Sequence, residues 1–356
     1  WVMKENLMKV IIVGAGIVGL TSAWYLHKAG YHVTLLEKES AATMREKSES
    51  GLFSIPHTQP FNRPGIFTKF WQGFAASAPA FKIRADFSIH QTRWGIEALK
   101  QSSAENYAQN RFRLFNLAKL SRGALYEILA EHEITFAHQQ SGALQICENE
   151  AALSAAATQK ALLKQHEIEA TLLTPEEVVE HEPALKSATK PIAGGLLFNN
   201  EEIGDSQQLC AALTKILQEF GVEFIYNCEV ERILTEESSG QIRAVTSGEY
   251  FYQADQYLFT TGAKSPTLFK EPFPLPIYPV KGYRLIYPIS PSLETLRSAL
   301  VDPEQNITLT RLKDLLYVSG YHGIEGFNAT QNPREITPLK EMVRAWLPHI
   351  ETQEPL

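Results

Sequence analysis

A glycine-rich motif near the N-terminus constrains the fold of this chain more than any other feature. The apolar residues 10–13 run directly into Gly14-x-Gly16-x-x-Gly19, and apolar residues at helical spacing follow. In this context Gly14 allows a tight turn, Gly16 lets the backbone approach a pyrophosphate, and Gly19 lets the helix pack against the strand. The helix N-terminus then offers N–H groups and the positive end of its dipole to phosphates. The motif therefore predicts a strand–turn–helix unit that binds a dinucleotide.

A second strand and an acidic residue support this interpretation. The apolar residues 33–36 end at Glu37, 18 residues beyond Gly19, where a carboxylate can accept hydrogen bonds from ribose hydroxyls. The uncharged run 10–26 could instead be a signal peptide or a membrane anchor. It is shorter than the roughly 20 residues that span a bilayer, three glycines interrupt it, and no small-residue cleavage site follows. We therefore interpret it as a buried β-α unit.

Composition places the chain among globular enzymes. Its 356 residues are enough for about two domains, and 44% hydrophobic with 21% charged residues is ordinary for such proteins. The net charge of −7 gives no overall basic field that would attract nucleic acid. Cys147, Cys210 and Cys228 form no C-x-x-C pair, which favours buried thiols in a reducing compartment.

The remaining chain alternates between helical and strand patterns. Thr174, Pro175 and Glu177 mark a helix start with a capping box, and Asp205 precedes an amphipathic helix that ends at Gly221. Other expected elements are helices over 96–129 and 151–166, a crossover at 193–195, and strands at 141–147, 222–225, 229–234, 254–260, 278–287 and 307–319. The aromatic and proline-rich segment 61–94 is expected to form an irregular layer. We expect this layer to roof a substrate pocket over the strand 278–287.

Several of these motifs together resemble the D-amino acid dehydrogenase small subunit, within the FAD-dependent D-amino acid oxidase/dehydrogenase family. They are residues 10–19, Arg93-Trp94, residues 182–185, Gly204-Asp205, residues 254–263 and residues 278–283, in an order that matches from about residue 8 to 350. The resemblance implies an α/β fold, with a Rossmann-like FAD-binding domain of the glutathione-reductase type. It also implies an α+β second domain with a separate antiparallel sheet for the substrate.

The resemblance also implies domain bounds and cofactor residues. The FAD-binding domain would comprise 8–60 and 193–268, the substrate domain 61–192 and 269–335, and the segment 336–356 would return toward the cofactor domain. Glu37 would hold the adenosine ribose, Val230 would contact adenine through its backbone, and Thr261 with Gly262 would line the pyrophosphate. The whole expected cofactor set is Val13, Gly14, Ala15, Gly16, Ile17, Val18, Gly19, Glu37, Lys38, Ser50, Gly51, Val230, Thr261 and Gly262.

Three residues on one strand are the candidate catalytic residues. Arg284 could bind a substrate carboxylate with its planar guanidinium, or pair with a surface acid. Tyr283 could bond the substrate or be a buried structural tyrosine, and Lys281 could lie near the flavin or in solvent. His57 and His322 have no partner at metal or catalytic-triad spacing, so we expect no metal.

The activity that the resemblance implies is oxidative deamination of D-amino acids, with electrons passing to a membrane quinone chain. The protein would be cytoplasmic, either free or peripheral on the inner membrane, and would bind no nucleic acid. Two alternatives stay open: a glycine or other amine oxidase of the same family, and a truncated, catalytically silent FAD-binding protein. An NAD-dependent dehydrogenase fits less well, because the second cofactor segment suits a longer flavin ligand.

Two departures from the family pattern bear on activity. The family's S-x-x-N-x-G loop against the flavin is replaced here by residues 47–54, without the asparagine. The family also continues beyond the position of Leu356 with a Gly-Leu-Arg-Pro segment, whose arginine binds the substrate carboxylate, and a glycine-rich segment. We expect these 356 residues alone to turn over D-amino acids at least about a hundredfold more slowly than an extended version.

Overall fold

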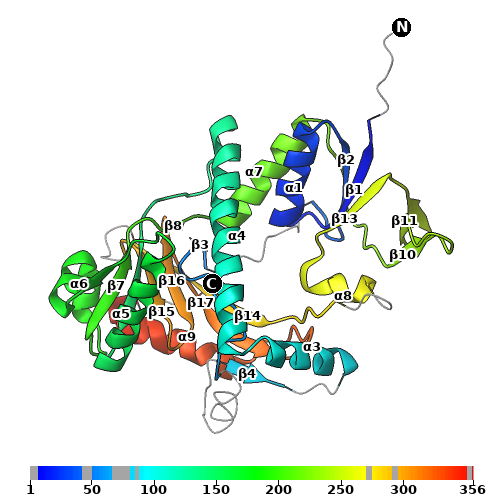
Figure 1. The fold of residues 1–356 in the computed structure, drawn as a ribbon. Coiled ribbons are helices and arrows are strands. Elements are labelled where there is room, and N and C mark those ends of the chain that lie inside the picture. Colours follow the sequence, from blue (N-terminus) through cyan, green and yellow to red (C-terminus); the bar gives the residue numbers. More distant parts are fainter. Residues whose placement is uncertain are drawn as a thin grey trace. The chain divides into compact units, whose positions relative to one another are not determined.

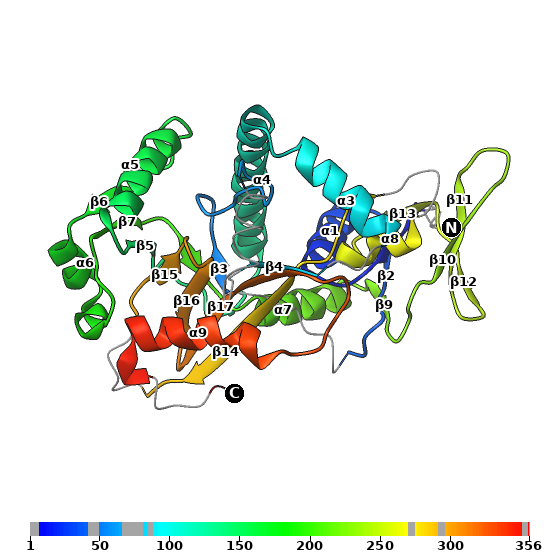
Figure 2. The same cartoon turned by 90° about the horizontal axis from the view of Figure 1, so that it is seen from below.

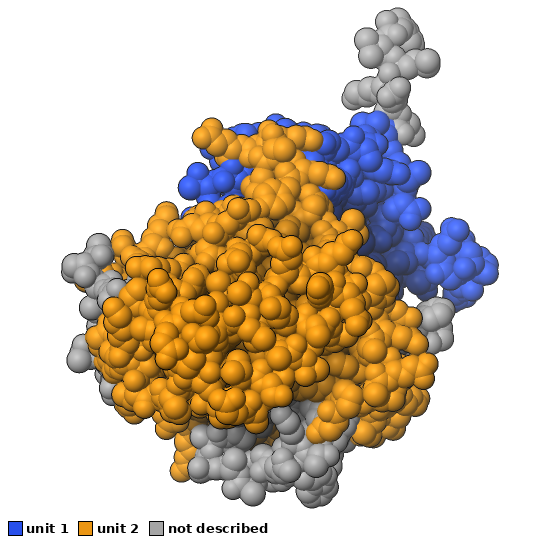
Figure 3. All heavy atoms as spheres, turned by 60° about the vertical axis from the view of Figure 1, so that its left-hand side comes forward, with its two compact units in different colours: residues 1–47, 134–136, 206–277 blue, residues 48–133, 137–205, 278–356 orange. Residues whose placement is uncertain are grey.

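The chain divides into two compact units, each with its own sheet and core. The computed structural model describes residues 7–41, 50–65, 81–84, 88–269, 275–290, 296–350 and 355. Unit 1 comprises Trp1–Lys47, Ile134–Phe136 and Ser206–Ile277, and unit 2 comprises Ser48–Glu133, Ala137–Asp205 and Tyr278–Leu356 (Figures 1 and 3). The two units are therefore built from segments that alternate along the sequence.

Unit 1 contains a parallel four-stranded sheet in the order β13-β1-β2-β9. Its strands are β1 (Lys9–Val13), β2 (His32–Leu36), β9 (Glu223–Ile225) and β13 (Gln256–Phe259). Helix α1 (Ile17–Lys28) joins β1 to β2 and packs beside α7 (Ser206–Glu219), which precedes β9 (Figure 1). Each helix connects or precedes a parallel strand, as β-α-β units require.

An antiparallel ribbon completes unit 1. Strands β10 (Arg232–Thr235), β11 (Ile242–Ser247) and β12 (Tyr250–Tyr252) pair in sequence order (Figure 2). Val245 of β11 is fully buried and packs with Ile11 and Val13 of β1 in one apolar cluster. A short 3-10 turn, η2 (Gly262–Lys264), and α8 (Ser265–Leu268) follow β13.

Unit 2 is organised around an eight-stranded mixed sheet. Its order is β14-β17-β16-β15-β5-β7-β6, and β4 pairs with β17. The strands are β4 (Phe81–Ile83), β5 (Ala143–Cys147), β6 (Thr171–Leu173), β7 (Gly194–Phe198), β14 (Lys281–Pro288), β15 (Ala299–Asp302), β16 (Ile307–Leu312) and β17 (Leu315–Ile324). Most neighbours are antiparallel, whereas β15 with β5 and β17 with β4 are parallel.

Helices cover this sheet on both faces. Helix α9 (Pro333–Trp346), followed by η3 (Pro348–Ile350), buries Leu339, Val343 and Trp346 against β14, β16 and β17 (Figure 2). Helices α6 (Pro175–His181) and η1 (Pro183–Ser187) contribute to the same cluster. On the other face, α4 (Ala104–Glu131) and α5 (Glu150–Lys164) pack on β5 and β7. The small sheet β3 (Leu52–Phe53) with β8 (Glu202–Ile203) adjoins this second face.

Most predicted elements are confirmed, and four are wrong. Within the described residues, the segment 61–94 is not wholly irregular, because it contains β4 and the start of a helix at Ile89. The predicted helix over 96–129 is two helices, α3 (Ile89–Lys100) and α4, because Ser103 accepts a hydrogen bond from Asn106 N and starts a new helix. The predicted crossover at 193–195 is the start of β7, where a Cβ on Gly195 would lie only 2.9 Å from Leu144 Cδ1 and 3.0 Å from Val178 Cγ2. Residues 307–319 form a hairpin of β16 and β17 instead of one strand.

The capping box is confirmed, since Thr174 Oγ1 accepts from Glu177 N and Glu177 Oε2 accepts from Thr174 N. The three cysteines are buried and form no disulfide with one another, as expected. Within the described ranges, no helix is long and apolar enough to cross a bilayer. Nor do the described histidine, cysteine and acidic side chains form a group that could hold a metal ion.

Candidate functional site

The glycine motif forms the expected turn at the end of β1. Gly14 has φ +102°, which glycine adopts readily, and its N–H donates to Leu36 O at 2.8 Å. A Cβ on Gly19 would lie 2.0 Å from Gly14 O, a separation that no side chain tolerates. The predicted roles of Gly14 in the turn and Gly19 in helix–strand packing are therefore confirmed.

Thr260, directly after β13, supports this turn. Its N–H donates to Val13 O at 2.9 Å, and its hydroxyl lies 3.0 Å from Val13 O and 2.8 Å from Gly14 O. The next two residues are the predicted cofactor residues Thr261 and Gly262. The Thr261 hydroxyl lies 2.8 Å from that of Ser265, and Gly262 is exposed with φ +53°. Thr260 was not predicted, although a hydroxyl residue at the carboxyl end of a parallel strand is a usable signal.

The start of α1 and Glu37 offer complementary groups to a dinucleotide. Gly16 is the N-cap of α1 and provides no side-chain cap, and no acidic residue lies in the first turn. Glu37 is buried, and its two carboxylate oxygens accept from Ala15 N at 2.8 Å and Glu39 N at 3.0 Å. Each oxygen has a further lone pair for a ribose hydroxyl. An uncapped helix N-terminus beside a carboxylate fits the phosphates and ribose of FAD.

The other predicted cofactor residues of unit 1 differ in exposure. Val230 packs its side chain into the core with Cys228, which leaves its backbone for a ligand contact. Val18 is 61% exposed, and Lys38 forms a surface ion pair with Glu39 at 3.1 Å. Their roles toward the cofactor stay predictions.

Ser50 and Gly51 belong to unit 2, where they begin a tightly bonded loop. Gly51 has φ +67°, its carbonyl accepts from Gly204 N at 2.8 Å, and a Cβ on it would lie 3.1 Å from Gly204 O. Ser50 Oγ accepts from Leu52 N at 3.2 Å. The two compact units thus meet in the sequence at 47–48 and at 205–206. The expected boundaries between the FAD-binding and substrate domains were at 60 and 193. Which unit binds the cofactor and which binds the substrate stays a prediction.

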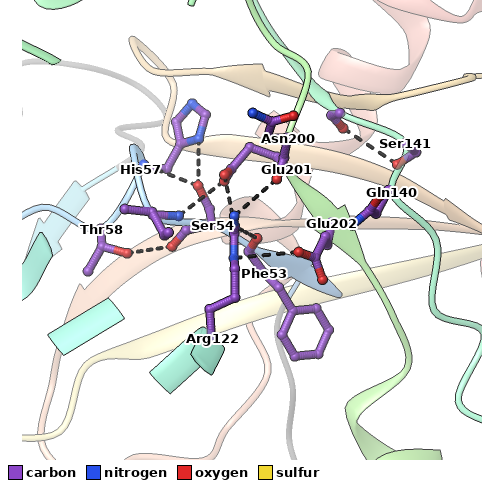
Figure 4. Close-up of polar contacts among 12 residues, drawn as sticks. Phe53, Ser54, His57, Thr58, Arg122, Gln140, Ser141, Asn200, Glu201 and Glu202 are labelled. Carbon is purple, nitrogen blue, oxygen red and sulfur yellow. Dashed lines mark hydrogen bonds and ion pairs between the residues drawn. The ribbon is translucent and has the colours of Figure 1, made fainter. Parts of the chain in front are cut away.

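Arg122 of α4 holds the loop that follows Gly51, as Figure 4 shows. Its guanidinium donates to Asn200 O at 3.0 Å, Phe53 O at 3.2 Å and Glu201 Oε1 at 2.9 Å. Its Nε lies 3.5 Å from Glu202 Oε1. Glu201 Oε2 accepts from Ile55 N at 3.1 Å. We call Arg122, Glu201 and the loop residues Phe53, Ser54 and Ile55 the Arg122 network.

Ser54 is the centre of the same loop. Its hydroxyl lies 2.9 Å from His57 Nδ1 and accepts from His57 N at 3.1 Å, while Ser54 O accepts from the Thr58 hydroxyl at 2.6 Å (Figure 4). Burial lowers the pKa of His57 to about 4, so this imidazole is neutral at pH 7. Burial also raises the pKa of Glu201, against hydrogen bonds from Ser54 and Arg122 that lower it.

The three candidate catalytic residues lie on two faces of β14. Tyr283 packs against the cluster that α9 shares with the sheet, together with Leu285 and Tyr287. Since side chains alternate along a strand, Arg284 points to the opposite face, where its guanidinium lies 5.3 Å from the centre of the Tyr317 ring. Arg284 is thus on a different face from Tyr283.

Tyr283 and Lys281 join a charged network with Glu335 of α9. Glu335 accepts from the Tyr283 hydroxyl and from Lys82 Nζ, both at 2.8 Å, and Lys281 Nζ lies 3.5 Å from Glu335. Burial alone would raise the pKa of Glu335, but the hydrogen bonds from Lys82 and Tyr283 lower it to about 2. Neither Glu335 nor Lys82 was predicted from the sequence.

Part of the expected aromatic layer is described. Trp94 lies 5.4 Å from the ring of Tyr278 and 6.1 Å from that of Phe61, centre to centre, and Gln91 Nε2 donates to the Tyr278 hydroxyl at 3.2 Å. Residues 66–80 and 85–87, which include Phe70, lie outside the described residues. The pocket that this layer was expected to roof stays a prediction.

Comparison with known proteins places this geometry in a family. A family model described as "FAD dependent oxidoreductase" (DAO) matches residues 9–355. A D-amino acid dehydrogenase from Vibrio vulnificus is 30% identical over 344 residues, which is 96% of this chain and 82% of that protein. The chain belongs to the DAO family of FAD-dependent oxidoreductases. FAD as cofactor and an oxidoreductase activity, both expected from the glycine motif and the resemblance, are thereby confirmed.

Solved structures confirm the fold of this DAO-family chain. Glycine oxidase from Geobacillus kaustophilus superposes with a TM-score of 0.74 at 16% identity, over 98% of this chain and 81% of that one. Glycine oxidase from Bacillus cereus gives 0.69 at 18% identity, over 98% and 80%. An FAD-bound L-α-glycerophosphate oxidase from Mycoplasma pneumoniae gives 0.66 at 16% identity, over 99% and 81%. This chain therefore shares its mixed α/β fold with these oxidases.

Proposed function

We propose that this oxidoreductase catalyses the oxidative deamination of D-amino acids to 2-oxo acids and ammonia. The observation that supports this most is the 30% identity to a D-amino acid dehydrogenase across 96% of the chain. When bound, FAD would supply the acceptor, taking the Cα hydrogen as hydride at N5 and leaving an imino acid that water hydrolyses. The chain itself would bind, orient and desolvate the reactants.

Each part of the proposed site has its own task. The turn Gly14–Gly19 and the N-terminus of α1 would bind the pyrophosphate, with Thr261 and Gly262 beside it. Glu37 would bind the ribose, and the Val230 backbone would contact adenine. Ser50 and Gly51 would contact the flavin. Arg284 would bind the substrate carboxylate, because a guanidinium pairs with carboxylate through two parallel hydrogen bonds.

Tyr283 and Lys281 stay candidates for the substrate side. The Tyr283 hydroxyl already donates to Glu335 and accepts from Asn332 N at 3.0 Å. A Tyr283→Phe variant therefore separates two roles: a substrate contact would raise the KM, while a purely structural role would lower only the free energy of unfolding.

The test begins with the cofactor. Purified protein incubated with excess FAD and then desalted should show flavin absorbance bands, and D-amino acids should reduce an artificial dye in its presence. Protein that stays colourless but binds NAD in a titration would contradict the proposal. Flavin bands without turnover of any amino acid would support the catalytically silent alternative.

A glycine or amine oxidase is the second candidate, and the fold shared with two glycine oxidases favours it. An oxidase should form hydrogen peroxide in step with substrate consumption. A dehydrogenase should instead transfer the electrons to a quinone analogue and form little peroxide. We further propose a membrane quinone chain as the acceptor and peripheral contact with the inner membrane. Reduction of a quinone in lipid vesicles, and cosedimentation with them, would test both.

A further inference from the structure

We propose that Arg122 and Glu201 are positioning residues that hold the loop after Gly51 in the shape that FAD binding requires. The proposal rests on the proposed function, which assigns Ser50 and Gly51 to the flavin. Arg122 fixes the carbonyl of Phe53 (Figure 4), and Glu201 fixes the amide of Ile55. One ion pair thus holds the backbone on both sides of Ser54.

Burial makes this ion pair a strict constraint. The side chain of Glu201 is 4% exposed and that of Arg122 is 21% exposed. If the loop moved away, the ion pair would remain, but the buried Glu201 carboxylate would lose the hydrogen bond from Ile55 N and the Arg122 guanidinium would lose its bond to Phe53 O. Leaving buried polar groups without their partners costs free energy. The loop also has internal bonds, from His57 N to Ser54 Oγ and from Thr58 N to Ile55 O at 3.1 Å. Together these contacts fix its conformation before any ligand binds.

Glu201 depends on Arg122 more than the neighbouring Glu202 does. Glu202 also accepts from the Tyr126 hydroxyl at 2.9 Å and lies 2.6 Å from His138 Nε2. Among the described residues, Arg122 is the cation paired with Glu201. The Glu201 carboxylate also accepts hydrogen bonds from Ile55 N and from Ser54. Loss of the guanidinium should therefore disturb the 53–55 loop more than the surroundings of Glu202.

Two ligands separate a local effect from a general one. ADP carries the adenine, ribose and pyrophosphate groups that the proposed function assigns to unit 1, whereas FAD also carries the flavin. We would measure the Kd of both by calorimetry for Glu201→Ala, Glu201→Gln and Arg122→Met. The matched control is Glu148→Gln, which removes the charge partner of Lys190 Nζ, 2.6 Å away in the same unit.

We expect Glu201→Ala to weaken FAD binding about tenfold or more, because the carboxylate's two hydrogen bonds with the loop, from Ile55 N and Ser54, are lost together with its ion pair to Arg122. ADP affinity should stay within about twofold for every variant, and Glu148→Gln should change neither Kd. Glu201→Gln keeps an acceptor oxygen for Ile55 N, so its effect on FAD should be smaller than that of Glu201→Ala.

Two results would overturn the inference: unchanged FAD affinity in all three variants, or equal losses of FAD and ADP affinity. The second result would mean a general loss of stability. If Glu201→Ala fails to fold, which loss of ADP binding reveals, Glu201→Gln and Arg122→Met decide by the same criterion. Wild-type protein that binds ADP but not FAD would instead overturn the proposed function itself, and this inference with it.

Discussion

Two sharp turns in this protein are stabilised by opposite means. The glycine turn of unit 1 is held by backbone groups and by the absence of side chains at Gly14 and Gly19. The loop after Gly51 in unit 2 is held by buried charged side chains, with Arg122 and Glu201 separated from it by 69 and 146 residues in sequence. A turn held by backbone groups should tolerate changes of pH but not added side-chain volume. A turn held by charged side chains should instead be sensitive to pH and tolerate added volume better.

The largest expected effect tests the backbone-built turn. Gly19→Val would place a Cβ 2.0 Å from Gly14 O and 2.9 Å from Thr260 Oγ1, and should lower the free energy of unfolding by about 3 kcal/mol or more. It should also abolish FAD binding, since α1 would be displaced. Denaturant unfolding and flavin absorbance measure both effects.

The control is Gly95→Ala in α3, where a Cβ would meet nothing within 4 Å. This change should stabilise the helix by up to about 1 kcal/mol. If Gly19→Val kept wild-type stability and FAD binding, the turn would not depend on close helix–strand packing, and the contrast with unit 2 would fail.

Acid pH should lower the stability of the loop that is held by side chains. The folded-state pKa of His57 is lowered from 6.5 to about 4, so the unfolded chain binds more protons between these values. The stabilisation is complete above pH 6.5 and is lost as the pH falls through 4, to a total of about 3 kcal/mol. Urea unfolding of wild type and His57→Gln at several pH values checks this.

In His57→Gln the decline of unfolding free energy between pH 6.5 and 4 should be shallower. Below pH 4.5 both proteins should lose further stability, because the folded-state pKa of Glu335 is about 2 and its protonation weakens the bonds from Lys82 and Tyr283. Identical pH profiles for the two proteins would show that His57 is not buried as a neutral group.

This contrast also explains what the sequence could and could not predict. The glycine turn was predictable because its constraints are local: strand, glycines, helix and Glu37 lie within one short stretch. The Arg122 network was not, since Phe53, Arg122 and Glu201 come from three distant segments. The paired acids Glu201 and Glu202 next to the buried Ile203 were a signal, but a sequence pattern does not identify their cation.

Strand 281–288 shows the same limit at the substrate side. The existence of this strand and the alternation of its side chains between two faces were predictable. Which side chains face α9 was not predictable, because that depends on how α9 packs on the sheet. As a result Lys281, Tyr283 and Arg284 were grouped as one site, although Tyr283 bonds Glu335 and Arg284 lies over Tyr317.

Glu37→Ala should have a moderate effect and sharpens the comparison within unit 1. Glu37 is a side-chain element of a largely backbone-built site, since its carboxylate accepts from Ala15 N and Glu39 N. We expect FAD to bind more weakly by about 1–3 kcal/mol, because those donors lose their acceptor and the ribose loses a partner.

Glutamine at position 37 is the informative second variant, measured by calorimetry with FAD and ADP. Both ligands carry the ribose, so their affinities should fall together, unlike the selective loss of FAD affinity expected for Glu201→Ala. A loss confined to FAD would place Glu37 at the flavin end and contradict the assignment to the adenosine ribose.

The smallest expected effect concerns a buried hydroxyl that has no partner. Thr310 of β16 is fully buried, and no described residue hydrogen-bonds its Oγ1. Thr310→Val keeps the shape of the side chain and removes the unpaired group, so it should raise the free energy of unfolding by about 1 kcal/mol.

Thr308→Val on the same strand is the control, because Thr308 is only half-buried and its replacement should change the free energy of unfolding by less than about 0.5 kcal/mol. Loss of stability in Thr310→Val would show that an ordered water satisfies the hydroxyl, and that polar groups in unit 2 are paired more completely than the protein contacts alone indicate.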